Sequence, residues 1–431
     1  MKYLLCLIDA LALLSGCGGG SVGTEGSVRL VNATSEYSTL DLYKASDRIS
    51  SGVASNDVGA YVSLDANTYT FNLKNGGSTA TSASTSRAVT KNEHRTLVAY
   101  TSGGTLTTEY LSDEESAPSS GTAKLRLFHT ASTDAGSVDL YLVNTACAEL
   151  QTSTAAATAS AVSGLQAGYT EVAAAAAGTT YHVCVTAVGD KSALRLDIPA
   201  LSLINQQVAT LILTRSSGGV LLNGLLLTQQ GTLTPALNSS ARVRLAASAT
   251  ASGGVGARLG GVLLGSLTSP AVGSYALVAA GSSSVEINGA TVALTGATTA
   301  VVAGGDFTLL VTGPAAAPAA RLVVDDNTVS TSTVRATKMR LVNGLNGVGG
   351  VVAMSVDDQA VGNGAAFGAA SSSAQVEASA GLARLEASYA TTQLYLRENV
   401  TLTTGKVYTL FLLGDLPVAP ALVSGILRVD R

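Results

Sequence analysis

The stretch that decides the fold is Ser27-Val28-Arg29-Leu30-Val31-Asn32-Ala33, because variants of it recur three more times along the chain. The related strings are Lys124-Leu125-Arg126-Leu127-Phe128-His129-Thr130, Arg242-Val243-Arg244-Leu245-Ala246-Ala247-Ser248 and Lys338-Met339-Arg340-Leu341-Val342-Asn343-Gly344. The Arg-Leu pairs of successive copies lie 97, 118 and 96 residues apart. Self-similarity at this spacing is typical of tandem domains. The sequence therefore predicts four copies of one unit.

Three further landmarks follow the string in a fixed order. The first is an Asp-centred strand, found as Leu40-Asp41-Leu42-Tyr43, as Val138-Asp139-Leu140-Tyr141 and, more loosely, as Ser355-Val356-Asp357. The second is a Gly followed closely by a Tyr, at Gly59 and Tyr61, Gly168 and Tyr169, and Gly273 and Tyr275; the fourth copy lacks the Tyr. The third is a Thr-Leu run before a Gly, beginning at Thr96, Thr210, Thr308 and Thr409. Because the order is kept, each copy is one complete unit.

The short runs within each copy indicate strands. They are rich in Val, Leu, Thr and Tyr, many alternate apolar with polar residues, and Gly, Asn, Asp or Ser separates them. Such spacing is typical of an antiparallel sandwich. We therefore predict an all-β fold of four tandem antiparallel β-sandwich (Ig-like) domains, with six or seven strands in each. Two Ala-rich stretches, residues 155–161 and 173–177, leave short helices as an alternative.

Loop-like segments set the predicted domain boundaries. The repeats are expected over residues 27–111, 121–228, 241–328 and 335–431, after a signal peptide over 1–16 and a Gly-rich tether over 17–26. A sandwich of about 90 residues buries only about two-thirds of its surface, which leaves room for neighbouring copies to pair.

The N-terminus has the pattern of an export signal. Lys2 precedes an apolar stretch from Tyr3 to Leu14, and Leu14-Ser15-Gly16-Cys17 follows. These four residues resemble the lipobox of bacterial lipoproteins, which implies that Cys17 becomes an acylated first residue and anchors the chain to a membrane. Gly18 after that Cys resembles the signal for the outer membrane, facing either the periplasm or the cell exterior. The alternative is a hydrophobic N-terminal helix packed into a core.

Composition excludes several classes of protein. Of the 431 residues only 13% are charged, and the formal net charge is −4. These values exclude a basic nucleic-acid binder and a charge-rich disordered tail. Beyond the N-terminus no uninterrupted apolar run reaches the roughly 18 residues that a membrane helix needs.

The repeated landmarks together resemble a known family. The Arg-Leu-Val-Asn-Ala opening, the Val-Asp-Leu-Tyr strand, the Gly-Tyr strand and the final Tyr-Thr-Leu strand before Gly are similar to the bacterial domain-of-unknown-function family 4397. The likeness extends over nearly all of residues 27–431 and is weakest in the third copy, where Arg258 stands near the expected Asp. This resemblance implies an exported tandem-domain protein and leaves its activity open.

Cysteine and histidine usage bears on candidate sites. Cys6 lies in the predicted signal peptide, which leaves Cys147 and Cys184 as a pair inside the second copy. An even pair in an exported chain predicts a disulfide, worth about 4 kcal/mol for a loop of this length; two buried thiols are the alternative. The three histidines have no spacing that suits zinc, so we expect no metal and no cofactor.

Two charged patterns allow further hypotheses. Asp41, Asp139 and Asp357 accompany three of the four repeated arginines, so we hypothesise a cross-strand ion pair worth under about 1 kcal/mol when exposed. The acidic groups at residues 113–115, 325–327 and 357–358 could offer oxygens to calcium, and solvated linker charge is the alternative interpretation.

The function expected from these patterns is binding or spacing at the cell envelope, not catalysis. No catalytic residues are expected, and the chain offers no nucleophile in a recognisable context. Expected partners are a membrane, through Cys17, and an envelope glycan or protein ligand, but no nucleic acid. One alternative is a structural or adhesive component that self-associates through sheet edges. A remote alternative is an enzyme that acts on glycans.

Overall fold

The computed structural model describes residues 24–161, 166–250, 253–330, 332, 335, 337–377, 382–416, 423 and 425–431. It confirms the all-β prediction: the described residues form 36 strands, with only a four-residue helix and a short 3-10 helix beside them. Among these residues no helix is long and apolar enough to cross a membrane. The Ala-rich stretches are not helical, because Ala159–Ala161 forms a strand and Ala173 ends another.

Nine consecutive strands build each of four units, which we call sandwiches 1 to 4. Sandwich 1 contains β1 (Glu25–Asn32), β2 (Thr39–Lys44), β3 (Asp47–Ala54), β4 (Asp57–Val58), β5 (Val62–Asp65), β6 (Asn67–Asn75), β7 (Ala83–Val89), β8 (His94–Ser102) and β9 (Thr105–Ser112). Sandwich 2 contains β10 (Thr122–His129), α1 (Ser132–Ala135), β11 (Val138–Val143), η1 (Cys147–Thr152), β12 (Ala159–Ala161), β13 (Gln166–Ala173), β14 (Thr179–Ala187), β15 (Asp190–Leu203), β16 (Val208–Arg215), β17 (Leu222–Thr228) and β18 (Leu233–Ala236).

The second half of the chain repeats this plan. Sandwich 3 contains β19 (Ser240–Thr250), β20 (Gly254–Leu259), β21 (Val262–Thr268), β22 (Ala271–Val272), β23 (Ala276–Ala279), β24 (Val285–Ile287), β25 (Ala290–Val292), β26 (Asp306–Pro314) and β27 (Ala319–Asp325). Sandwich 4 contains β28 (Thr337–Asn346), β29 (Val352–Val356), β30 (Gln359–Ala360), β31 (Ala369–Ala370), β32 (Ala374–Val376), β33 (Ala383–Tyr389), β34 (Thr392–Val400), β35 (Val407–Asp415) and β36 (Gly425–Val429).

Each sandwich has an inner and an outer sheet with one shared strand order. The inner sheet of sandwich 1 runs β4-β1-β8-β9, with β5 also paired to β1, and its outer sheet runs β3-β2-β6-β7. The other three sandwiches follow the same two orders with their own strands, and β18 adds a fifth strand beyond β17. A separate apolar core fills each sandwich, and buried Phe71 and Phe307 are among the largest side chains in those of sandwiches 1 and 3.

One strand pair in every inner sheet departs from the antiparallel pattern. The strand that opens each repeat lies parallel to the strand that carries its Thr-Leu run, so β1 pairs with β8 and β19 pairs with β26. In all four copies the repeated Arg lies directly opposite the repeated Thr, as Arg29 does Thr96. The first and last landmarks of the repeat are therefore neighbours in space.

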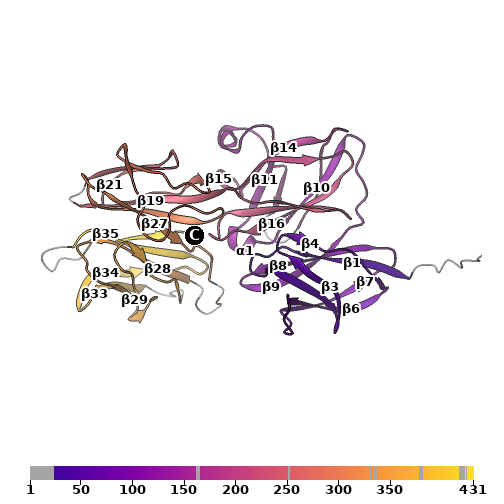
Figure 1. The fold of residues 1–431 in the computed structure, drawn as a ribbon, viewed down its shortest axis with the longest axis horizontal. Helices are drawn as coiled ribbons and strands as arrows, with labels where there is room; N and C mark the ends of the chain where they lie inside the picture. Colours follow the sequence, from indigo (N-terminus) through magenta and orange to yellow (C-terminus); the bar gives the residue numbers. More distant parts are fainter. Residues whose placement is uncertain are drawn as a thin grey trace, which may run out of the picture.

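The sandwiches pack in two pairs through their inner sheets. In the first pair, Val31, Tyr100 and Leu111 of sandwich 1 pack against Phe128 and Ile212 of sandwich 2. A matching cluster joins sandwiches 3 and 4 and contains Ala246, Leu310, Val342, Phe411 and Leu413. Each half is thus a stack of four sheets, outer-inner-inner-outer. Figure 1 shows sandwiches 1 and 2 on the right and sandwiches 3 and 4 on the left.

Candidate functional site

The repeated arginines lie at the faces where the sandwiches pair. In each copy the Arg Nε donates to the Thr Oγ1 of the parallel neighbour, at 2.8, 3.2, 3.0 and 2.9 Å in chain order. The repeated Tyr stacks on the same guanidinium, with centroid distances of 4.5 Å for Arg29 and Tyr61 and 4.6 Å for Arg126 and Tyr169. The Arg, Thr and Tyr landmarks therefore form one polar cluster in each of the first three copies, and the fourth copy keeps the Arg and the Thr.

Sandwiches 3 and 4 exchange ion pairs through these arginines. Arg340 Nη2 lies 2.7 Å from Asp325 Oδ1 of sandwich 3, and Arg244 pairs with Asp430 of sandwich 4. Each Arg also contacts the Asp of its own sandwich, Arg244 at 3.2 Å and Arg340 at 3.7 Å. All four side chains are buried. Two guanidinium groups and two carboxylates thus neutralise one another across the interface.

The pKa values in this network show the effect of the opposite charges. Burial alone would raise the pKa of Asp325, but the charges of Arg340 and Arg244 and hydrogen bonds from Tyr275 and Thr308 hold it below its usual value. The Tyr275 hydroxyl donates to Asp325 Oδ2 at 2.6 Å, and burial, together with that carboxylate, raises the pKa of Tyr275. Asp325 is therefore ionised and Tyr275 neutral at physiological pH.

Sandwiches 1 and 2 are joined by a less symmetrical version of this network. Arg29 Nη1 donates to the carbonyl oxygen of Gly231 at 2.5 Å, and Arg29 lies 3.8 Å from Asp113. In sandwich 2 the position that corresponds to Asp113 is occupied by Gln229. The two positions correspond because the backbone N–H of Asp113 donates to β8 and that of Gln229 donates to the equivalent strand, β16. Gln229 exchanges two hydrogen bonds with the backbone of Glu115, at 3.0 and 2.8 Å.

The hypothesised pairing of the arginines with Asp41, Asp139 and Asp357 is wrong. Asp41 and Asp139 lie on strands of the outer sheets and Asp357 lies in the turn after β29, and each accepts a backbone N–H from a neighbouring strand or turn. The donors are Gly52, Gly189 and Arg384, at 2.7, 2.8 and 2.7 Å. The true partners lie at the end of the last strand of the inner sheet: Asp325 is its final residue in sandwich 3, and Asp113 and Asp430 directly follow it in sandwiches 1 and 4. The interpretation of residues 113 and 325 as solvated linker charge is also wrong, because both side chains are buried.

The disulfide prediction is confirmed, and the other predicted residues are scattered. Cys147 on η1 is bonded to Cys184 on β14, with a sulfur–sulfur distance of 2.08 Å. His182 lies beside the pair, and its Nε2 is 2.5 Å from Asp197 Oδ1. His129 is buried with Nε2 2.7 Å from the Gly136 carbonyl oxygen, and burial lowers its pKa. Cys17, the predicted lipid anchor, lies outside the described residues.

The two halves of the molecule meet at a narrow junction. The turn after β16 contacts sandwich 3, where the N–H of Gly218 and the hydroxyl of Ser216 both donate to the Gly304 carbonyl oxygen, at 2.9 and 2.8 Å. Arg431 Nη1 donates to the carbonyl oxygen of Gly219 at 2.7 Å. Gly304 has a φ of +71°, and a Cβ there would lie 2.5 Å from the Cβ of Ser216. The close approach therefore requires glycine.

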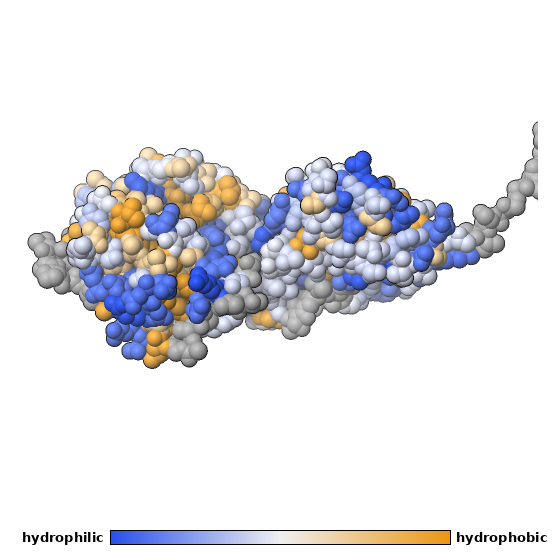
Figure 2. Space-filling view, turned by 90° about the horizontal axis from the view of Figure 1, so that it is seen from below, coloured by the Kyte–Doolittle hydropathy of each residue, from blue (hydrophilic) through white to orange (hydrophobic). Residues whose placement is uncertain are grey.

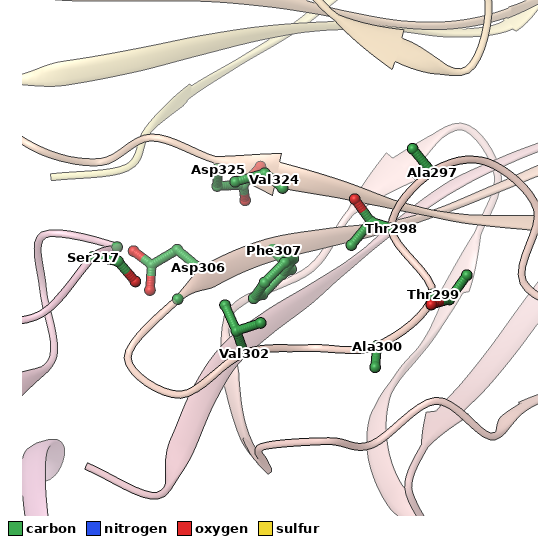
Figure 3. Close-up of a pocket in the computed structure, with 12 residues that line it drawn as sticks. Ser217, Ala297, Thr298, Thr299, Ala300, Val302, Asp306, Phe307, Val324 and Asp325 are labelled. Carbon is green, nitrogen blue, oxygen red and sulfur yellow. The ribbon is translucent and has the colours of Figure 1, made fainter. Parts of the chain in front are cut away.

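A groove opens beside this junction. A cavity of about 560 Å³ lies between the segment 297–302, which leads into β26, and the strand ends at Phe307 and Val324. Figure 3 shows Thr298 and Val302 on that segment, close to Phe307 and Val324. A second cavity of about 420 Å³ shares Ala297, Thr298 and Val324 with the first and continues toward residues 368–371 of sandwich 4. Together they form one groove, which we call the β27 groove.

The walls of the β27 groove are mainly small and apolar, and its carboxylates are already engaged. Asp306 receives two hydrogen bonds from Arg242, at 2.8 and 2.5 Å, and Asn327 Nδ2 donates to it at 2.7 Å. Burial nonetheless raises the pKa of Asp306. Asp325 is held in the interface network. Both acids therefore hold the scaffold together, and the groove offers apolar contacts and backbone groups to a ligand.

One family model matches part of the chain, and its description gives no activity. Residues 26–141 match the model of a family described as Domain of unknown function (DUF4397). The match covers sandwich 1 and reaches β11 of sandwich 2, which confirms the predicted resemblance over that range. No curated protein matches the chain.

Two solved structures are distantly similar. One is the TIE protein of Bacillus anthracis, at 8% identity with a TM-score of 0.15, covering 62% of this chain and 45% of that one. The other is CBMbc (family CBM26) from Eubacterium rectale Amy13K in complex with maltoheptaose, also at 8% identity and a TM-score of 0.15, covering 49% of this chain and 95% of that one. The aligned part spans less than half of the Bacillus anthracis protein. Likenesses this distant carry no argument about function.

Proposed function

We propose that this chain is an exported binding protein of the cell envelope, in which two rigid pairs of sandwiches hold the β27 groove at a fixed place. The observation that carries the proposal is the groove itself, an open and mostly apolar cavity lined in part by Asp325, whose carboxylate belongs to the buried ion-pair network. Such a site is suited to binding. The carboxylates beside it are engaged by Arg242, Arg244 and Arg340, so the arrangement favours recognition over acid–base chemistry.

The exposed surface supports a binding role for the second half of the molecule. Figure 2 shows two lobes, and apolar residues gather more on the lobe of sandwiches 3 and 4 than on the other. Val302 and Val324, at the groove, are 59% and 56% exposed. Exposed apolar groups beside a cavity favour a partner that covers them.

Membrane attachment through Cys17 is part of the proposal. A lipid-anchored Cys17 would place the first pair of sandwiches next to the bilayer and leave the second pair as the distal, ligand-binding half. The test compares the full chain with a Cys17→Ser variant in an exporting bacterial host. We expect the parent in the membrane fraction, with an acylated N-terminal Cys by mass spectrometry, and the variant in the soluble fraction. An unmodified N-terminus in the membrane-bound parent would contradict the anchor.

The binding role is tested with a groove-filling variant. Thr298→Trp places a large side chain in the β27 groove from a loop, outside the cores. The purified soluble protein and this variant are each incubated with envelope glycans and with envelope protein extract. We expect a ligand that the parent retains and the variant loses. If both proteins retain the same ligands equally, the β27 groove is not the binding site.

Self-association through sheet edges is the second candidate. The observation that favours it is the edge position of β27 in its sheet, with Val324 exposed on that strand. Analytical ultracentrifugation of the soluble protein distinguishes the two candidates. A monomer over a hundredfold concentration range supports ligand binding, whereas polymers that grow with concentration support assembly.

A further inference from the structure

The inner sheets of sandwiches 2 and 3 differ at one equivalent edge. In sandwich 2 the edge of β17 is covered by β18, which pairs antiparallel with it, Leu225 opposite Pro235 and Leu227 opposite Leu233. In sandwich 3 the equivalent strand β27 ends the sheet order. Sandwich 2 therefore shows how an added strand occupies this edge, and in sandwich 3 no described strand pairs there.

The backbone of β27 presents hydrogen-bonding groups at that edge. The N–H of Thr295 donates to the Ala320 carbonyl oxygen at 2.9 Å, so Ala320 faces away from β26. Backbone groups alternate in direction along a strand, so Leu322 and Val324 face the same way. The Val324 carbonyl accepts from Arg340 at 2.9 Å. Among the described residues none bonds to the outward N–H groups of Leu322 and Val324 or to the Leu322 carbonyl.

The β27 groove runs beside these open groups. The segment after β25 touches β27 only at its beginning, through a parallel bridge from Leu294 to Ala320, and then diverges from the strand. The space that it leaves is the groove, walled by residues 295–302 on one side and 368–371 on the other. Arg321 donates to Thr295 Oγ1 of the first wall at 3.3 Å and to the carbonyl oxygen of Phe367, directly before the second wall, at 3.2 Å.

We propose that the β27 groove binds an extended, uncharged segment of a partner polypeptide, which adds to β27 as an antiparallel strand. The inference rests on the proposed binding function and names its ligand class. Backbone bonds to Leu322 and Val324 supply affinity, and alternate side chains of the segment face the walls. The chemistry of the occupant follows from β18, whose sequence Leu233-Thr234-Pro235-Ala236 is uncharged. Charged side chains would lose hydration against Ala297, Val302 and Val324.

The test uses a fluorescein-labelled peptide with the sequence of residues 232–237, Thr-Leu-Thr-Pro-Ala-Leu, and the soluble full-length protein. Fluorescence anisotropy measures binding. Val324→Pro removes an outward N–H without removing a bond to β26, so we expect affinity to fall about fivefold to tenfold, the effect of one backbone hydrogen bond. Thr298→Trp fills the groove and should abolish saturable binding. The matched control is Thr108→Pro, an outward-facing position of the equivalent strand β9, which should bind like the parent.

The outcomes separate this inference from the proposed function. Strand addition is supported if the parent binds the peptide saturably, Thr298→Trp abolishes this binding, Val324→Pro weakens it and Thr108→Pro leaves it unchanged. Binding unaffected by Thr298→Trp and Val324→Pro would place the peptide elsewhere, for instance on β17 in place of β18, and would overturn the inference. Absence of saturable binding by the parent would also overturn it, while retention of an envelope ligand by the parent alone would leave the proposed function standing. Thr298→Trp keeps the test valid if circular dichroism shows that Val324→Pro misfolds.

Discussion

Replacing Asp325 by Asn should uncouple sandwich 3 from sandwich 4. The side chain is fully buried and lies 2.7 Å from Arg340 and 3.2 Å from Arg244, which are themselves only 3% exposed. Asn keeps the shape and removes the charge, so two buried guanidinium groups face the single carboxylate of Asp430. Breaking a buried ion pair by removing one partner costs about 3–5 kcal/mol, because the remaining charge is left uncompensated. We expect a loss of that size in the second half of the chain.

Hydrogen exchange with mass spectrometry measures this loss in the full-length protein. A destabilisation of about 3–5 kcal/mol speeds exchange through opening by about two to four orders of magnitude, here in β19, β26, β28 and β35. Sandwiches 1 and 2 serve as an internal reference and should not change. The matched control is Asp358→Asn, whose carboxylate is 79% exposed beside Arg384 and whose loss should cost under about 1 kcal/mol. Equal effects of the two substitutions would refute the reasoning.

The same network predicts a dependence on pH. The folded-state pKa of Asp325 lies below that of an unfolded Asp, which is about 4. Its contribution to stability is therefore complete above about pH 4 and is lost as the pH falls through the folded-state pKa. Because Gln229 stands where the other copies have an Asp, the network of sandwiches 1 and 2 has one carboxylate fewer to protonate. Exchange should therefore accelerate first in sandwiches 3 and 4 as the pH falls. Exchange measured between pH 5 and 3 checks this order.

Three more predictions concern sandwich 2 and the junction. Replacing Cys147 and Cys184 by Ser should destabilise sandwich 2 by about 4 kcal/mol, because the disulfide closes a loop over a separation of 37 residues in the unfolded chain. Unfolding of the parent with and without reductant measures this loss. An unchanged unfolding midpoint would contradict it. Burial lowers the pKa of His129, so as the pH falls the unfolded state binds a proton at this residue before the folded state does. Stability should therefore fall between pH 7 and 5. His129→Asn, which introduces the residue type of the first and fourth copies, should remove that fall in thermal melts. Gly304→Ala should separate the two halves, because its Cβ would meet Ser216; small-angle scattering should give a larger radius of gyration while the melting of each half stays the same.

The repeat and its fold could be predicted because their signals are local. Strand and turn residues alternate within each copy, and the recurring string identifies where each copy begins. The register of Arg29 opposite Thr96, and its equivalents, explains why these residue types recur: one donates to the other across a parallel pair. The parallel pairing itself could not be predicted, because it joins strands that lie about 67 residues apart and periodicity does not specify distant partners.

The partners of the arginines could not be predicted for the same reason. Asp41 and its equivalents occur soon after the Arg in sequence, but they face the outer sheet and cap backbone groups there. The true partner follows the repeated Thr by 17 residues in copies one and three and by 21 in copy four. A search for a carboxylate at that spacing would have found Asp113, Asp325 and Asp430. The β27 groove has no sequence signal, since it depends on where residues 295–302 leave the strand.

The stacking of inner sheets makes the pair, not the single sandwich, the smallest part that can stand alone. A lone sandwich 1 would present Val31, Val98, Tyr100 and Leu111 to water, together with the buried cation of Arg29. During synthesis the first sandwich therefore forms with an exposed apolar face that is covered only when the second sandwich has folded. Fragments for expression or for grafting should therefore be cut between β18 and β19. By the same reasoning, a gene duplication that adds a pair of sandwiches would preserve solubility, whereas one that adds a single sandwich would not.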